Sequence, residues 1–391
     1  MSKHYLKPGW RIVKFGDIAQ NVAIRVDPSE AKTDIYVGLE HLDPETLHLR
    51  HWGHPSDVTG QKLAFKKGDV IFGRRRAYQR KLAVAEFDGI CSAHAMVIRA
   101  KPKMILPEFL LFFLQSDMFM ERAIAISVGS LSPTINWTTL CIQEFPLPPI
   151  EEQKRIAEIL WAADEVIEEW SKSIMNLETI VTQIAFAYFK YSGYEVQTLR
   201  SQVSESAYGP RFSSSKYSNS GALGQIRTTD ISEDGTINYS TVPLANLDVE
   251  DYKFHILRTD DLLISRSGTC GVACVFKKQS LPMLPGAFLI RFRLKESLNS
   301  EFAKEYFNSQ VGRAHTAKLS QGGVQNNLRG STLLQQFLPV PPIQTQMTVV
   351  DTFCLLRKEL KLLWEHRFRS VGLAKHLCNE MISPMMELSN V

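Results

Sequence analysis

A cluster of basic residues at positions 74–81 has the side chains of a nucleic-acid contact. The segment reads RRRAYQRK, with five cations around one tyrosine, and it directly follows a strand-like apolar run. Arginine and lysine neutralise phosphates, and an arginine can also hold a guanine edge through two hydrogen bonds. A charged hairpin that merely faces water would have the same composition. The candidate DNA contacts here are Lys67, Arg74, Arg75, Arg76, Tyr78, Arg80 and Lys81.

A different set of polar residues occupies the corresponding place in the second half of the chain. Residues 265–271 read SRSGTCG, with one arginine among small and hydroxyl-bearing residues. Two recognition surfaces that read different sequences would differ in this way. Two further loops, 208–217 and 321–327, offer donors, amides and aromatic rings that could contact bases or the DNA backbone. The first could equally be a flexible serine-rich connection, and the second could be a plain loop between a helix and a strand. The candidate contacts in this half are Tyr208, Arg211, Lys216, Arg227, Arg266, Ser267, Thr269, Gln321, Gln325 and Asn326.

The sequence contains no motif of a catalytic or metal site. Histidines stand at positions 41, 48, 51 and 54, but their spacing matches no common zinc site. There is no phosphate-binding glycine loop and no G-x-G-x-x-G. The Asn- or Asp-Pro-Pro-aromatic sequence needed for adenine methylation is missing, as is an acidic-plus-lysine nuclease cluster. We therefore expect no catalysis, no metal and no cofactor in this chain.

A long helix must position the first set of candidate residues. After the prolines of 146–149, apolar residues recur alternately four and three apart as far as Tyr188. An average spacing of 3.5 keeps one stripe against a partner, which is typical of a coiled coil. The prolines suit the start of a helix, and Lys190 and Gly193 suit its end. The predicted stripe is Ile156, Leu160, Ile167, Trp170, Ile174, Leu177, Val181 and Ile184.

A second copy of this helix is predicted over residues 341–385. Its two leading prolines stand 193 positions after two of the first helix, and Gln346 matches Gln153 at the same separation. Arg367 and Ser370 interrupt its stripe. Two helices with one-sided stripes should pair with each other, although each could instead pack on its own neighbouring domain. The second stripe is Val349, Phe353, Leu356, Leu360, Leu363 and Leu377.

The segments that precede the two helices are also related. Residues 261–264 (DLLI) stand 192 positions after 69–72 (DVIF), and Arg291 matches Arg99 at the same separation. Residues 107–126 have helical spacing of their phenylalanines. A repeat of this length implies two copies of one unit. The predicted order is a mixed α/β domain over 1–145, a helix over 146–193, a second domain over 194–340 and a helix over 341–385.

The bulk composition indicates a globular chain with room for two or three cores. Of its 391 residues 44% are hydrophobic and 22% are charged, and the net charge is +4. That charge permits a polyanionic partner without requiring one. The apolar runs are too short to span a membrane, and the first residues lack a signal-peptide core. Six scattered cysteines fit a reducing compartment, so we expect a cytoplasmic protein without membrane contact.

The junction at 146–157, PLPPIEEQKRIA, resembles the specificity subunit of type I restriction–modification systems. Stretches at 36–41 (YVGLEH), 87–92 (FDGICS) and 224–231 (GQIRTTDI) are also similar to that family. The resemblance covers essentially the whole chain. The second junction departs from the pattern at Thr345, which stands where the first has a glutamate.

The resemblance implies an α+β fold with two pseudo-repeated target recognition domains and two long antiparallel coiled-coil helices. Each domain would read one half of a split sequence in double-stranded DNA, and the helices would set the spacing and dock adenine methyltransferase subunits. Motor–nuclease subunits would join for cleavage, and S-adenosylmethionine would bind to the methyltransferases. This chain itself would be non-catalytic.

Two other functions compete with this one. A coiled-coil scaffold could join partner proteins without reading DNA, and binding through several phosphates would distinguish the two by its steep salt dependence. A self-contained restriction enzyme would need the methyltransferase motifs that the sequence lacks.

Overall fold

The computed structural model describes residues 6–191, 193–268, 270–319 and 327–384. It divides into two compact units, of which the first is Met1–Lys172 with Trp364–Val391 and the second is Ser173–Leu363. Both units combine helices with sheets, which confirms the α+β class. No helix in the described ranges is both long enough and apolar enough to cross a membrane.

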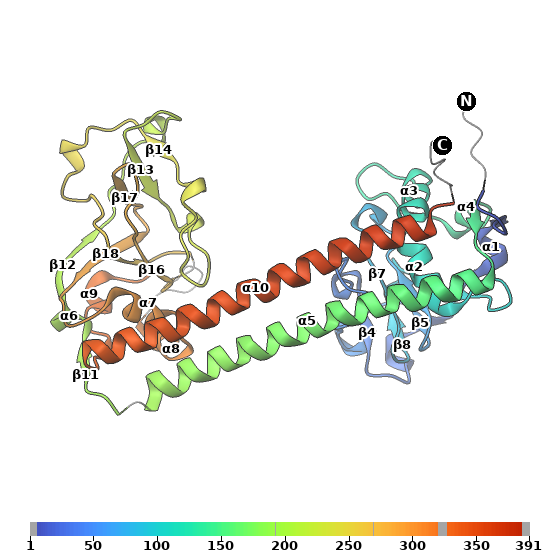
Figure 1. The fold of residues 1–391 in the computed structure, drawn as a ribbon, viewed down its shortest axis with the longest axis horizontal. Coiled ribbons are helices and arrows are strands. Elements are labelled where there is room, and N and C mark those ends of the chain that lie inside the picture. Colours follow the sequence, from blue (N-terminus) through green and yellow to red (C-terminus); the bar gives the residue numbers. More distant parts are fainter. Residues whose placement is uncertain (1–5, 192, 269, 320–326, 385–391) are drawn as a thin grey trace, which may run out of the picture. The chain divides into compact units, whose positions relative to one another are not determined.

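Two long helices contribute to both units. Helix α5 spans Ile150–Tyr191 and helix α10 spans Ile343–Ile382 (Figure 1). Prolines precede both, since a residue without an N–H fits where no intrahelical acceptor exists. Helix α5 begins in the first unit and ends in the second, whereas α10 begins in the second and ends in the first. Each unit therefore holds a segment of both helices.

In the first unit the two helix segments pack antiparallel. Leu160 of α5 shares a buried cluster with Cys378 of α10. Further along α5, the ring of Trp170 stacks on that of His366 with 5.0 Å between their centroids. Later residues of α5 thus contact earlier residues of α10, as in an antiparallel pair. The predicted pairing of the two helices is confirmed for this segment.

Arg367 maintains the contact between the helices at the point where the apolar stripe is interrupted. Its Nε donates to Ser171 Oγ at 3.0 Å, and its Nη1 lies 3.3 Å from Oε2 of Glu45. The guanidinium thereby joins α10 both to α5 and to the loop between strands β4 (Tyr36–Val37) and β5 (Lys62–Phe65). At this interruption of the apolar stripe, the two helices are therefore joined by a hydrogen bond.

In the second unit, the buried side of α5 shifts around the helix axis as the helix approaches its C-terminal end. Phe189 is buried, and its ring centroid lies 6.4 Å from that of Phe353 on α10. Ile184, a predicted stripe residue, is 40% exposed. An α-helix drifts about 20° per heptad from a 3.5-residue repeat. Ile184 follows Ile156 by 28 positions, so this drift turns its side chain towards solvent. The prediction that Ile184 lies on the buried stripe was therefore wrong. The other predicted stripe residues are buried or half-buried: Ile156, Leu160, Ile167, Trp170, Ile174, Leu177, Val181, Val349, Phe353, Leu356, Leu360, Leu363 and Leu377.

Two four-stranded sheets and one strand pair form the body of the first unit. In spatial order the first sheet is β2 (Ala19–Asn21), β9 (Met96–Ala100), β6 (Val70–Phe72) and β7 (Leu82–Val84). The second is β3 (Arg25–Val26), β5 (Lys62–Phe65), β8 (Gly89–Cys91) and β4 (Tyr36–Val37), and the pair is β1 (Arg11–Lys14) and β10 (Glu144–Leu147). Alternate residues of β6 face different cores, because side chains alternate along a strand. Val70 and Phe72 join the core that holds the helices, and Ile71 joins the other.

The second unit repeats one four-stranded sheet and the strand pair, whereas its remaining sheet has three strands. Its four-stranded sheet is β12 (Val203–Tyr208), β18 (Leu289–Leu294), β15 (Leu262–Ser265) and β16 (Ala273–Val275). Its other strands are β14 (Leu244–Ala245), β13 (Leu223–Ile226) and β17 (Met283–Pro285), with the pair β11 (Val196–Thr198) and β19 (Phe337–Pro339). The parallel pair β13–β17 matches the parallel pair β4–β8 of the first unit. The order of strands supports the predicted duplication.

A serine divides the helical stretch of each unit into two helices. Residues 107–126, predicted as one helical stretch, are broken at Ser116, whose Oγ donates to Phe113 O at 2.7 Å and accepts from Phe119 N at 3.3 Å. These bonds end one helix and cap the next. Ser309 makes the corresponding break in the second unit. The helices are α1 (Phe15–Ile18), α2 (Pro107–Gln115), α3 (Asp117–Ala125), α4 (Trp137–Leu140), α6 (Leu199–Gln202), α7 (Ser300–Asn308), α8 (Gln310–Leu319) and α9 (Gly330–Leu333).

The structure corrects one match between the two copies. Arg99 holds Asp69 through bonds of 2.6 and 2.8 Å, and Arg293 holds Asp261 at 3.2 Å. The two aspartates directly precede the matching strands β6 and β15. Arg293 is therefore the counterpart of Arg99, and the predicted match with Arg291 was wrong. The arginine lies 30 positions after its aspartate in the first copy and 32 in the second, so two extra residues shift the register.

Candidate nucleic-acid interface

Residues 74–81, the basic loop, form a tight turn at the end of β6. Arg76 (φ 57°) and Arg80 (φ 54°) adopt the left-handed conformation on either side of the 3₁₀ turn Ala77–Gln79. This conformation costs residues other than glycine about 1–2 kcal/mol. In the described part of the chain Asp260 is the one other non-glycine residue with a positive φ. Strained backbone of this kind occurs most often at functional sites.

Residues 128–134, the bracing loop, support the basic loop from the side. The backbone N–H of Arg76 donates to Pro133 O at 2.7 Å. Ser132 Oγ accepts from Arg75 Nη2 and from Arg76 Nε, both at 3.3 Å. Two loops distant in the sequence therefore form one surface, with arginine side chains at their junction.

The basic side chains of this loop differ in what they contact. Arg80 forms an ion pair with Asp117, and Lys81 Nζ donates to Leu39 O at 2.8 Å. Both are therefore engaged within the first unit. Among the ion pairs of the described residues, none involves the three arginines that open the loop. Their charge is available to a polyanion, as is the ring of Tyr78, which is 54% exposed.

Lys67 does not belong to this surface. It lies in the turn before β6, where its backbone N–H donates to Asp88 Oδ1 at 2.8 Å. Arg74 lies after the other end of the same strand. Three strand residues separate the two ends by about 10 Å. Lys67 therefore lies apart from the other residues of the predicted cluster.

His94 joins the basic loop, although sequence reasoning missed it. It lies in the turn before β9, and Met96 at the start of that strand pairs with Phe72 at the end of β6. The pKa of His94 is lowered mainly by its partial burial and also by the positive charges of Arg75 and Arg74. The pairing of strands distant in the sequence creates this neighbourhood, so no local motif signals it.

In the second unit, arginines lie over aromatic rings at the corresponding edge. Arg266 follows β15, and its Cζ lies 4.7 Å from the ring centroid of Tyr208. The hydroxyl of Tyr208 accepts from Gly330 N at 2.9 Å, which fixes the ring. Arg211 lies 6.0 Å from the ring of Phe288, a half-exposed residue that the sequence did not suggest. Three of the predicted residues are thus brought together with one unexpected aromatic ring.

Other predicted contacts of this unit are separate from that edge cluster. Arg227 binds Asp230 through Nε and Nη2 at 3.0 and 2.8 Å and also donates to Thr241 O, so its guanidinium is engaged internally. The side chain of Lys216 is exposed, and Ser267 is half-buried in the loop after β15. Thr269, Gln321, Gln325 and Asn326 lie outside the described residues.

Arg74 and Arg266 occupy equivalent places in the two units. The carbonyl of Arg74 accepts from Ile135 N at 3.0 Å, and that of Arg266 accepts from Leu328 N at 2.9 Å. In both residues Nε is buried and has no hydrogen-bond partner within the described chain. An unsatisfied buried donor costs about 1–3 kcal/mol.

The histidines of the first unit make contacts other than metal ligation. His48 lies between two carboxylates, with Nδ1 2.6 Å from Glu86 Oε1 and Nε2 2.7 Å from Asp164 Oδ2. The hydrogen bond to Asp164 raises the pKa of His48 despite its burial. His41 Nδ1 accepts from Gly38 N at 3.0 Å. Within the described ranges no three His, Cys, Asp or Glu side chains are grouped so as to hold a metal ion.

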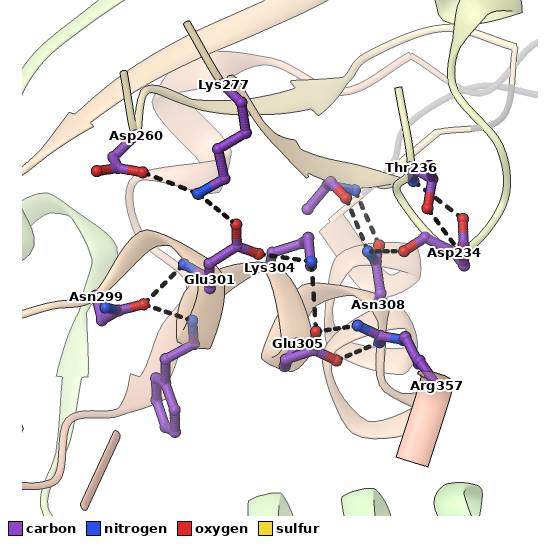
Figure 2. Close-up of polar contacts among 12 residues, drawn as sticks. Asp234, Thr236, Asp260, Lys277, Asn299, Glu301, Lys304, Glu305, Asn308 and Arg357 are labelled. Atoms are coloured by element: carbon purple, nitrogen blue, oxygen red, sulfur yellow. Dashed lines mark hydrogen bonds and ion pairs between the residues drawn. The ribbon is translucent and has the colours of Figure 1, made fainter. Parts of the chain in front are cut away.

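A chain of ion pairs fixes α10 to the second unit's sheet (Figure 2). Lys277 lies 3.1 Å from Asp260 and 2.7 Å from Glu301, while Lys304 links Glu301 to Glu305. Although burial opposes the effect, the two lysines lower the pKa of Glu301. Both oxygens of Glu305 then bind Arg357 of α10, as Figure 2 shows. The turn before β15, at the end of the strand away from Arg266, is thereby joined to the long helix through paired charges.

Residues 9–178 and 193–362 each match the family model described as Type I restriction modification DNA specificity domain. The chain belongs to this specificity-domain family. The two matches cover most of the chain as consecutive copies, which confirms both the predicted family and the predicted duplication.

Known type I specificity subunits are similar to part of this sequence, and solved structures are similar to its fold. Over 188 residues the chain is 29% identical to the Type I restriction enzyme HindI specificity subunit of Haemophilus influenzae, and the match spans 46% of this chain and 40% of that protein. A solved structure concerning complex assembly and conformational transition of the type I R-M system is 21% identical, with a TM-score of 0.64 over 97% of this chain and 98% of that one. The S subunit of M. genitalium is 15% identical, with a TM-score of 0.53 over 96% and 97%.

Proposed function

We propose that this chain is the DNA-binding specificity subunit of a type I restriction–modification complex. Its target recognition domains, over 1–145 and 194–340, would each read one half of a two-part target in double-stranded DNA. The observation that carries the proposal is a shared scaffold with unlike side chains. Arg74 and Arg266 stand at equivalent places, but one is followed by further arginines and the other lies over Tyr208. Unlike half-sites require this kind of difference, because base edges are read by specific side chains.

The residues we propose as contacts are those at the two edges, together with the exposed Lys216 and with Ser267 in the loop after β15. Phosphate contacts fix a protein on the duplex, whereas contacts to base edges specify the sequence. Both kinds are available where arginines adjoin exposed rings. In the first unit the contacts are Arg74, Arg75, Arg76, Tyr78 and His94, and in the second Tyr208, Arg211, Lys216, Arg266, Ser267 and Phe288.

Selection of duplexes from a randomised library by the full-length chain tests this function. We expect two enriched blocks of sequence separated by unread positions. Binding should also weaken steeply as salt rises, because each neutralised phosphate releases counterions. A scaffold without DNA readout would enrich no sequence and show no such salt dependence. That outcome would favour the rival function.

We propose that adenine methyltransferase subunits dock on the long helices. Apolar side chains on these helices remain exposed, among them Met175, Leu355, Phe368 and Leu373. Exposed apolar surface of this kind is typical of a protein interface. The methyltransferases would bind S-adenosylmethionine and extrude the adenine, since methylation requires the base to leave the stack. Motor–nuclease subunits would join the same complex in the cytoplasm.

The chain itself would supply recognition and no chemistry. The full-length chain incubated with S-adenosylmethionine and target duplex should then transfer no methyl groups. Addition of the methyltransferase subunits should start the transfer. Methylation by this chain alone would contradict the proposal.

A further inference from the structure

Leu131 at the tip of the bracing loop is almost fully exposed. Its side chain is 91% accessible to solvent, and that of Val128 in the same loop is 68% accessible. Single exposed leucines are common on protein surfaces, so exposure alone indicates no function. Two features distinguish this leucine: the hydrogen bonds that hold its loop and the arginine side chains beside it.

The bracing loop is held by backbone hydrogen bonds at its base. Val128 N donates to Thr134 O at 3.0 Å, and Thr134 N donates to Val128 O at 2.9 Å. Thr134 also forms an antiparallel bridge with Arg75 of the basic loop. Gly129, with φ +117°, permits the sharp turn that follows. Leu131 is therefore presented by a closed turn.

Two cationic side chains lie beside this apolar tip. Ser132, the residue after Leu131, accepts hydrogen bonds from Arg75 Nη2 and Arg76 Nε. The two guanidinium groups thus lie beside the leucine. An apolar side chain beside two cations matches a nucleic-acid duplex, in which phosphates flank an apolar stack of bases.

We propose that Leu131 is a wedge that inserts between base pairs of the half-site bound by the first unit. Arg75 and Arg76 would hold phosphates next to the opened step. Proteins that insert leucine, isoleucine or phenylalanine in this way unstack the step they enter. An opened step would reduce the work needed to extrude a neighbouring adenine for methylation. This inference rests on the proposed function.

The test uses the full-length chain and the duplexes that it selects from a randomised library. Each base of the half-sites is replaced in turn by the fluorescent analogue 2-aminopurine, whose emission rises when it loses its stacking. Binding of the natural chain should raise the emission at one step. Leu131→Ala should abolish that rise and weaken binding about tenfold, the ratio that corresponds to 1.4 kcal/mol. The slope of affinity against salt should not change, because no phosphate contact is lost.

Two further variants serve as controls. Leu131→Met keeps a large apolar side chain and should retain both the emission rise and the affinity. Ile142→Ala removes another exposed apolar side chain of the same unit and should change neither. Thermal unfolding of Leu131→Ala should match the natural chain, because surface substitutions usually change stability by less than about 0.5 kcal/mol.

The outcomes separate this inference from the proposed function. If Leu131→Ala binds selected duplexes as the natural chain does, the wedge is excluded and the proposed function stands. The wedge is also excluded if no position shows an emission rise, even where affinity falls. If the natural chain enriches no duplex at all, both proposals are wrong.

Discussion

Gln153 and Gln346 make the same three hydrogen bonds, each in the first turn of a long helix. Gln153 Oε1 accepts from Leu106 N at 2.9 Å, and its Nε2 donates to Met104 O at 3.2 Å and to Pro148 O at 2.9 Å. The side chain is completely buried. One amide thus joins the start of α5 to the start of α2, so the recognition domain is attached to its helix at a fixed point.

Gln346 repeats this attachment in the second unit. Its Oε1 accepts from Asn299 N at 2.8 Å, and its Nε2 donates to Ser297 O and Pro341 O at 2.9 and 2.7 Å. Replacement of either glutamine by alanine leaves three buried backbone groups without partners. We expect Gln346→Ala to lower the free energy of unfolding by roughly 3 kcal/mol, measured by urea denaturation.

Gln344→Ala provides the matched control. Gln344 lies two positions earlier in the same turn, but its side chain is exposed. Its replacement should change the free energy of unfolding by less than about 0.5 kcal/mol. Equal effects of the two substitutions would show that the buried amide has no special role.

Replacement of both Arg75 and Arg76 by glutamine should weaken DNA binding. If each arginine neutralises one phosphate, the slope of log affinity against log salt should become shallower by about 2. The measurement is a salt titration of binding to a selected duplex. Lys103→Gln removes one positive charge from an exposed position near the opposite end of β9 and should leave the slope unchanged. Identical slopes for all three proteins would exclude the basic loop from the interface.

The ion pairs of His48 should make the stability of the first unit depend on pH. Both ring nitrogens face carboxylate oxygens, those of Glu86 and Asp164, so this arrangement requires the protonated imidazole. The hydrogen bond to Asp164 raises its pKa above the unfolded value, against the effects of burial and of Arg50. Stabilisation is therefore fully present below about pH 6.5 and is lost as pH rises through the folded pKa.

His48→Gln should remove this dependence on pH. The difference in the free energy of unfolding between natural and variant chains should be largest near pH 5.5 and should shrink at higher pH. Each unit by which the folded pKa exceeds the unfolded one corresponds to about 1.4 kcal/mol. His51→Gln replaces an exposed histidine nearby and should leave the pH profile unchanged. A constant difference across pH would mean that His48 is not protonated in the folded chain.

The long helices and the duplication could be predicted because their signals are local or periodic. Prolines mark the helix starts, and an apolar residue every three or four positions marks the buried face. The break at Ser116 could not be predicted, because a serine inside an apolar helical pattern is compatible with a continuous helix. Its effect depends on hydrogen bonds to Phe113 and Phe119 that only the folded turn provides.

The candidate site was harder to predict than the fold. Phe288 and His94 reach the two recognition edges from strands distant in the sequence, so no motif contains them. Arg227 is a different case, because its partner Asp230 lies three positions away and the sequence offered the pair directly. Composition identified the basic loop as a cluster, but it could not show that Arg80 forms an ion pair with Asp117 whereas Arg75 donates a hydrogen bond to Ser132.

The length of the two helices should determine the unread spacer of the DNA target. Four helix-forming residues inserted near the middle of both α5 and α10 add about 6 Å, at 1.5 Å per residue. Since DNA rises about 3.4 Å per base pair, we expect the spacer to lengthen by roughly two base pairs. Mapping of methyladenine in cells that carry the variant with its methyltransferase subunits measures this. Alanine replacement of four residues at the same sites, without insertion, should leave the spacer unchanged. A lengthened variant with the original spacer would mean that the helices do not set the distance between half-sites.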